Sequence, residues 1–264
     1  MVSNIVIFSF VIAALATLVL PVALTVFLGI KQKINIPPFF IGVAAFFVSQ
    51  VVIRLPILNA LADVGWYQDF MLRFPLLALF LIGGLSAGLF EEGARFGGVH
   101  ILKKQRTFKD AVSFGLGHGL CEVIFLVGLL HINNIVLAIA INVGGGLLAA
   151  IAAGMTPELL ESITQQMVEL SPWLIYYGVF ERVCAVIAHI FFTVLVFKSV
   201  VERKAAYFIL AILTHALFNF VIVGLGSQVG LWAAFVSMTV MALAAGAYVL
   251  RCRRRWAFQN TENP

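Results

Sequence analysis

The chain has 264 residues, of which 62% are hydrophobic and only 11% are charged, and its mean hydropathy is +1.06. A soluble domain carries about 25% charged residues, so this composition excludes a soluble globular protein and indicates a polytopic membrane protein. The net charge of +5 comes from basic residues in short clusters between apolar runs, as membrane topology requires. The lipid bilayer is therefore the expected partner, and no nucleic acid is expected.

Eight apolar segments are long enough to cross a hydrocarbon core about 30 Å thick, which needs about 20 residues. Because lipid offers the backbone no hydrogen-bonding partner, each is predicted to be a helix. The predicted fold class is therefore all-α, a transmembrane bundle of about eight spans in a single integral-membrane domain of residues 1–264. The predicted spans cover residues 4–29, 36–57, 70–101, 110–130, 134–153, 173–198, 206–224 and 229–250.

Two further local patterns concern packing and the membrane surface. Gly83-Gly84 and Gly144–Gly146 are predicted to let helices approach closely. A short amphipathic helix is predicted near 157–170, because Thr156-Pro157-Glu158 is a helix-start pattern. Its apolar stripe favours a position on the membrane surface, and an ordinary loop helix and a role in substrate gating are equal alternatives for what it does there. The stripe consists of Leu159, Leu160, Ile163, Met167 and Leu170.

The basic clusters give an incomplete topology. Lys31–Lys33 and Lys103–Arg106 are both cytoplasmic if the N-terminus is outside, by the positive-inside rule. With eight full spans, Lys198–Lys204 and Arg251–Arg255 would fall on the opposite side. Either one segment within 110–172 does not cross fully or the charge rule fails, and an outside N-terminus is the favoured start.

Two adjacent glutamates, Glu91 and Glu92, follow an almost wholly apolar run and precede Arg95. An ionisable side chain at bilayer depth costs roughly 2.5–3.5 kcal/mol on insertion scales. Two neighbouring carboxylates cost more, because like charges cannot both ionise cheaply. Such a pair is expected to face other helices or a wet cavity, and it marks a functional site by default.

The other polar residues within the spans repeat at helical spacing. Glu91 and Arg95, His118 and Glu122, and His215 and Asn219 are each four residues apart, which places each pair on one helix face. Arg182 and His189 are seven apart, with Glu181 next to Arg182. One polar face on each of four helices is what a shared interior site needs.

The polar residues of these four spans are also predicted to lie at similar depths in the bilayer. In each span, one of them is 9 to 11 positions from a basic residue near the end of the span. At 1.5 Å per residue, all four lie roughly 13–17 Å from a basic boundary, which is close to mid-bilayer. The four pairs are Glu92 with Lys103, His118 with Lys109, His189 with Lys198, and His215 with Lys204.

Each of these residues also has a structural interpretation. A single intramembrane histidine is more often a hydrogen-bonding residue between helices, and Glu181–Arg182 or Glu91–Arg95 could be an ion pair alone. The structural interpretation weakens when so many polar residues share matching faces and depths. His100 and His131 fall outside the pattern and are expected to be structural.

These residues resemble the motifs of the glutamic-type intramembrane proteases, the superfamily of type II CAAX prenyl proteases, Abi/CPBP proteins and PrsW, and most of all its YhfC-like branch. The resemblance covers residues 70–225, the expected catalytic core. One departure is that prenyl proteases usually have EExxxR as the first motif, so a prenylated substrate is not implied. The matching segments are Glu91–Arg95 for EExxR, Phe114–His118 for FxxxH, His118–Glu122 for HGxxE, Glu181-Arg182 with His189 for ER…H, and His215–Asn219 for HxxxN.

The resemblance implies a hydrolase of the bacterial cell membrane that cleaves a peptide bond of a membrane protein or peptide. It implies that Glu91, beside Glu92, acts with His118 to activate a water, while His215 and Asn219 donate hydrogen bonds to the oxyanion. Supporting roles fall to Arg95, Glu122, Glu181, Arg182 and His189. No cofactor is implied, and the spans carry no HExxH zinc motif.

A metal-dependent alternative remains open, because histidine and glutamate are suitable Zn²⁺ ligands. Its ligands would come from His118, His189, His215 and Glu91. Two other functions also remain open: a proton-coupled transporter, whose buried acids and histidines relay protons, and a non-catalytic scaffold with the same fold. A transporter usually contains internal repeats, and no convincing repeat is found here.

Overall fold

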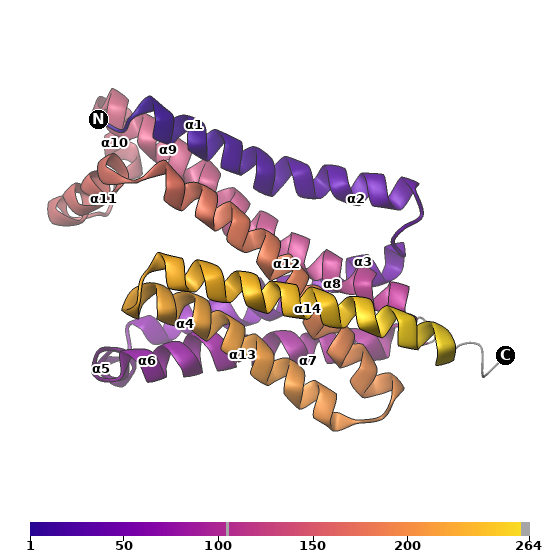
Figure 1. Cartoon of the computed structure of the whole chain (residues 1–264). Coiled ribbons are helices and arrows are strands. Elements are labelled where there is room, and N and C mark those ends of the chain that lie inside the picture. The colour runs from indigo at the N-terminus through magenta and orange to yellow at the C-terminus, as the bar shows by residue number, and fades with distance from the viewer. Residues whose placement is uncertain (104–105, 260–264) are drawn as a thin grey trace. The chain divides into compact units, whose positions relative to one another are not determined.

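A computed structural model describes residues 1–103 and 106–259, and every regular element among them is a helix (Figure 1). This confirms the all-α prediction. The helices are α1 (Asn4–Ala14), η1 (Leu15–Val19), α2 (Leu20–Ile30), α3 (Ile36–Phe46), η2 (Phe47–Arg54), α4 (Leu55–Ala62), α5 (Gly65–Arg73), α6 (Pro75–Ala78), η3 (Leu79–Leu85), α7 (Ser86–Ile101), α8 (Phe108–Glu122), η4 (Val123–Gly128), α9 (Leu129–Val143), α10 (Gly145–Ile151), α11 (Pro157–Glu169), α12 (Pro172–Val201), α13 (Ala205–Gln228) and α14 (Leu231–Gln259), where η marks π-helical segments.

Consecutive elements merge into longer helices, and within the described residues seven of these are long and apolar enough to cross a membrane. The prediction of eight was wrong at one place, because 110–130 and 134–153 are not separate spans. A single helix runs from Phe108 to Val143 and continues through Asn133 and Asn134. No glycine or proline interrupts it there, and polar side chains alone do not end a helix. The seven are Asn4–Ile30, Ile36–Ala62, Pro75–Ile101, Phe108–Val143, Pro172–Val201, Ala205–Gln228 and Leu231–Trp256.

Seven spans remove the conflict in the charge pattern. If the N-terminus is outside, each odd-numbered span ends on the inside of the membrane. Lys31–Lys33 follow the first span, Lys103–Arg106 follow the third, and Lys198–Lys204 lie at the end of the fifth. The terminal cluster Arg251–Arg255 closes the seventh span. All four basic clusters therefore fall on one side, as the positive-inside rule requires.

The described chain divides into two compact units. The first unit contains residues 1–27 and 123–182, and the second contains 28–122 and 183–264. The single integral-membrane domain expected from the sequence stays a prediction, and each unit is described by itself.

In the first unit, α1 packs along α9 and the predicted amphipathic helix is confirmed as α11. Thr156 caps α11, since its hydroxyl accepts a hydrogen bond from the Leu159 amide at 3.3 Å. Ile163 and Met167 on the apolar stripe of α11 pack into a small core with α1 and α9. Met167 is therefore buried in protein and Ile163 is partly buried, whereas Leu159 at the start of the stripe is 50% exposed. That core is formed by Val2, Val6, Phe10, Ala13, Ala138, Met167 and Ile175.

Glycines hold the helices of the second unit at backbone contact. A Cβ on Gly42 of α3 would collide with the Phe114 carbonyl of α8, and one on Gly117 of α8 would collide with the Phe39 carbonyl of α3. A Cβ on Gly84 would lie 2.6 Å from the Ala216 carbonyl oxygen of α13. We call these lines of backbone contact the glycine seams. They hold α3 against α8, and η3–α7 against α13, so closely that no side chain fits between the helices.

The glycine prediction was right for Gly84 and wrong for Gly144–Gly146. None of these three glycines has an atom within 4 Å of an added Cβ. Gly144 and Gly145 instead have φ angles of 67° and 61°, which L side chains rarely adopt. Their role is to turn the chain between α9 and α10.

Replacing Gly117 by alanine is expected to destabilise the protein by about 2–3 kcal/mol, because the added methyl group must push two backbones apart. Unfolding of the purified protein in bicelles would measure the change. Gly97→Ala on α7 is the matched control, since nothing lies within 4 Å of its added Cβ. An equal loss in both variants would contradict the seam.

Candidate active site

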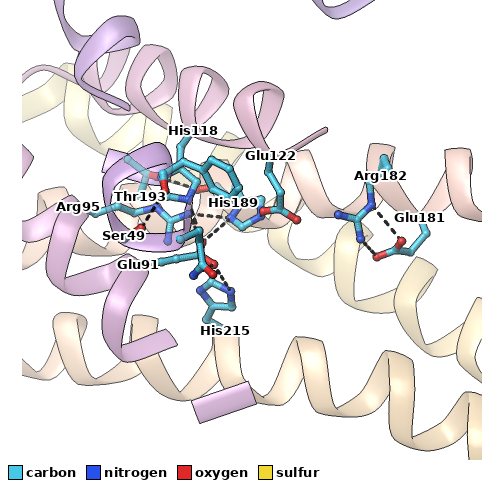
Figure 2. A network of polar contacts seen from close by, with 12 residues as sticks. Ser49, Glu91, Arg95, His118, Glu122, Glu181, Arg182, His189, Thr193 and His215 are labelled. Atoms are coloured by element: carbon cyan, nitrogen blue, oxygen red, sulfur yellow. Dashed lines mark hydrogen bonds and ion pairs between the residues drawn. The ribbon is translucent and has the colours of Figure 1, made fainter. Parts of the chain in front are cut away.

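Four helices of the second unit bring a group of polar side chains together (Figure 2). Glu91, Glu92 and Arg95 come from α7, since positions three and four residues apart share a helix face. All but one of the side chains are almost fully buried, and Glu92, Arg95 and His118 are 0% exposed, whereas that of Glu122 is 12% exposed. The other members are His118 and Glu122 of α8, His189 of α12 and His215 of α13.

Glu91 is the centre of this group, and three histidine nitrogens face its carboxylate. His118 Nε2 lies 2.8 Å from Glu91 Oε2. His189 Nδ1 lies 3.9 Å from the same oxygen, and His215 Nε2 lies 3.8 Å from Oε1. In Figure 2 the three rings approach Glu91 from different helices. The sequence spacing therefore identified side chains that meet in space.

Glu92 and Arg95 form the second part of the group. The Arg95 guanidinium pairs with Glu92 Oε1 through Nη1 and lies 3.4 Å from Glu91 Oε2 through Nη2. One cation thus serves two buried carboxylates. Without Arg95, each buried carboxylate would carry an uncompensated charge in a low-dielectric environment, which is strongly destabilising.

Carboxylates also fix two of the histidine rings. Glu122 Oε2 lies 2.5 Å from His189 Nε2, and Glu92 Oε1 lies 2.7 Å from His215 Nδ1. A carboxylate that accepts from one ring nitrogen sets the orientation of the ring and directs the other nitrogen elsewhere. The other nitrogen of His215 faces Glu91, whereas that of His189 lies 2.7 Å from Arg95 Nη2 and 3.9 Å from Glu91 Oε2. Phe192 stacks on His215 with ring centroids 4.7 Å apart and holds it from the side.

Two residues of the site were missed in the sequence. Gln50 Nε2 donates to Glu91 Oε1 at 2.8 Å, and Arg54 Nη1 donates to Gln50 Oε1 at 2.9 Å. Arg54 also donates to Ser86 Oγ at 3.0 Å, which ties η2 to the start of α7. The signal was present, because Gln50 and Arg54 are polar residues four apart within an apolar span.

The remaining predicted residues lie elsewhere or lack a described partner. Asn219 follows His215 by one turn of α13, is half-buried, and makes no side-chain hydrogen bond to a described residue. Glu181 and Arg182 belong to the first unit, where they pair with each other. His100 Nδ1 contacts the Phe96 carbonyl at 2.8 Å at the exposed end of α7. His131 is buried in the first unit beside Phe10.

Part of the group is suited to hold a metal ion. Glu91, His118 and His189 each offer one ligand atom, and these atoms lie within 4.8 Å of one another. Tetrahedral Zn²⁺ with bonds of about 2.0–2.1 Å separates its ligand atoms by about 3.3 Å. Glu91 Oε2 lies 2.8 Å from His118 Nε2 and 3.9 Å from His189 Nδ1, and these two distances lie on either side of that value. Glu122 behind His189 adds the carboxylate that metal-binding histidines usually have.

Comparison with known proteins agrees with a membrane protease. The family model described as YhfC intramembrane metalloprotease matches residues 16–244. The uncharacterized membrane protein YhfC of Bacillus subtilis (strain 168) is 31% identical over 201 residues, which cover 76% of this chain and 77% of that protein. No solved structure matches the chain.

Proposed function

Since the chain belongs to the YhfC family of intramembrane metalloproteases, we propose that it hydrolyses a peptide bond of a membrane-associated protein or peptide at the group around Glu91. It is an integral membrane protein of the bacterial cell membrane. The observation that carries the proposal is the convergence of His118, His189 and His215 on one buried carboxylate. A set of bases and hydrogen-bond partners at one point is the arrangement that hydrolysis requires.

Glu91, His118 and His189 would hold a divalent metal ion, with Glu122 orienting His189. When bound, such an ion supplies Lewis-acid chemistry, polarising a peptide carbonyl and making water a nucleophile near neutral pH. Arg95 keeps Glu92 paired beside these ligands. The chain then shields the reacting groups from bulk solvent, since His118 is fully buried and Glu91 is nearly so.

His215 and Asn219 serve the peptide carbonyl. Glu92 holds His215 by Nδ1, so that Nε2 faces the reaction centre. Asn219 is one turn further along α13 and has an amide available to a substrate. In the proposed mechanism the Asn219 amide and the Nε2–H of a doubly protonated His215 donate hydrogen bonds to the oxyanion that develops as the carbonyl is attacked. One such hydrogen bond contributes about 3–4 kcal/mol to catalysis.

A second mechanism, without a metal, is favoured by one contact. Arg95 Nη2 lies 2.7 Å from His189 Nδ1, the nitrogen that would otherwise be the metal ligand. In that arrangement Glu91 and His118 activate the water directly as a general base pair. Both mechanisms give Glu91 and His118 essential roles, and they differ in whether the protein carries a metal.

Replacing His118 by alanine is expected to lower cleavage at least about a hundredfold, because a ligand or base is removed. Cleavage would be measured as new peptide termini formed in a reconstituted bacterial membrane proteome. Metal would be counted per chain in the same preparations by mass spectrometry. His100→Ala is the matched control, because His100 is exposed at the end of α7.

The outcomes separate the proposals. About one metal per wild-type chain, lost in His118→Ala and kept in His100→Ala, supports the metal mechanism. Cleavage lost in His118→Ala with no metal in any preparation supports the glutamate mechanism. Equal cleavage by all three proteins contradicts the proposed protease function.

A further inference from the structure

A polar cavity lies in the second unit, and none of its lining residues belongs to the group around Glu91. It is formed where α12 ends, α13 begins and α14 ends, and its volume is about 240 Å³. Pockets for drug-sized ligands measure about 300–1,000 Å³, so this one suits a smaller group. Its lining residues are Lys198, Val201, Glu202, Lys204, Tyr207, Cys252, Arg255 and Trp256.

The cavity carries an excess of positive charge. Lys198, Lys204 and Arg255 stand against one carboxylate, that of Glu202. Lys198 Nζ lies 2.6 Å from Glu202 Oε1, and Lys204 Nζ lies 3.3 Å from Oε2. Arg255 has no ion pair with any described residue, so its guanidinium is available to an anion.

One of the basic groups, Lys198, is held in place before any ligand arrives. Lys198 and Glu202 have side chains only 15% and 18% exposed, and the Lys198 ammonium lies 4.7 Å from the centre of the Tyr207 ring. Burial acts to raise the pKa of the Glu202 carboxyl, but the hydrogen bonds and charges of Lys198 and Lys204 outweigh it and hold this pKa below its usual value. Glu202 therefore stays ionised and organises the lysines without cancelling the cavity's charge.

The location is the boundary of the membrane. The cavity's residues close the fifth and seventh spans and open the sixth, on the side where the basic clusters gather. Tryptophan and tyrosine favour this interface, and basic clusters next to a span attract anionic lipids. Trp256 and Tyr207 supply the aromatic part, and Arg253 and Arg254 continue the basic cluster.

We propose that this cavity binds a phosphate group, supplied by the headgroup of an anionic phospholipid in the leaflet on the basic side. Arg255 and Lys204 contact the phosphate oxygens, since a guanidinium and an ammonium are the usual partners of phosphate in proteins. Lys198 adds a further positive charge to the cavity lining, and Trp256 would lie beside the lipid. The proposal does not depend on the hydrolysis proposed at Glu91.

The test uses the full-length protein in nanodiscs of phosphatidylcholine, with or without phosphatidylglycerol, followed by native mass spectrometry of the lipid that stays bound. A third preparation contains phosphatidylcholine alone with inorganic phosphate added, and its thermal stability is measured. The pocket variant is Lys204→Gln with Arg255→Gln. The control is Lys31→Gln with Lys33→Gln, which makes the same charge change at an exposed turn on the same side.

Wild type and the control are expected to retain phosphatidylglycerol, and the pocket variant is expected to retain it about tenfold less. The charge-conserving Lys204→Arg with Arg255→Lys is expected to keep most of the binding, which separates lost charge from misfolding. Stabilisation by inorganic phosphate that the pocket variant lacks, without retained lipid, would assign the site to a soluble phosphate. Equal retention by the pocket variant and wild type, or equal loss in the control, would overturn the proposal.

Discussion

Replacing Glu91 by glutamine is expected to reduce cleavage by at least about a thousandfold while the protein still folds. Glutamine has the same shape and can still bond Gln50, but it is neither a strong metal ligand nor a base. Both proposed mechanisms therefore fail in this variant. New peptide termini in a reconstituted membrane proteome would measure the loss.

Glu161→Gln is the matched control for this change. Glu161 is an exposed residue of α11 in the first unit, and its replacement is expected to leave cleavage unchanged. Equal cleavage by Glu91→Gln and wild type would show that Glu91 does not act on the substrate. Loss of folding can be checked separately by thermal unfolding of the same samples.

Replacing Arg95 by methionine is expected to destabilise the protein by about 3–5 kcal/mol. The guanidinium is 0% exposed, pairs with Glu92 and lies beside Glu91. Methionine fills a similar volume but leaves two buried carboxylates without their cation. Unfolding in bicelles, monitored by circular dichroism, would measure the change.

Arg73→Met provides the control, because Arg73 and Asp69 are also an arginine and an acid four residues apart. Their side chains are 72% and 66% exposed, so the loss there is expected to stay below about 1 kcal/mol. Adding Glu92→Gln to Arg95→Met is expected to recover part of the stability, since one unpaired charge is removed. Similar losses at Arg73 and Arg95 would contradict a buried charge cluster.

The sequence predicted much of the site, because ionisable groups in an apolar span carry information that ordinary core residues do not. The spacing of Glu91 with Arg95 and of His118 with Glu122 indicated which faces meet, and the structure places these side chains together. Equal depth in the bilayer then selected His189 and His215. Gln50 and Arg54 are also polar residues four apart within a span. They were not predicted as site residues, because neither is an acid or a histidine.

Other features could not be read from spacing. A helix face shows where a side chain points, but not which neighbouring helix meets it, so Glu181 and Arg182 could not be assigned to the first unit. The asparagines at 133 and 134 resemble a loop in composition, yet the backbone stays helical through them. Gly117 was not singled out, because close approach depends on the partner helix and not on local pattern.

The glycine seams also bear on how the site can change over evolutionary time. Gly88 of α7 lies one turn before Glu92, and Gly117 of α8 is next to His118. Gly88 packs against the Ile212 carbonyl of α13 and Gly117 against the Phe39 carbonyl of α3, so no side-chain substitution can bring α7 closer to α13, or α8 closer to α3. A variant that keeps the contact between α7 and α13 therefore keeps the spacing between Glu92 and His215, and a change of specificity would have to come from the side chains around them.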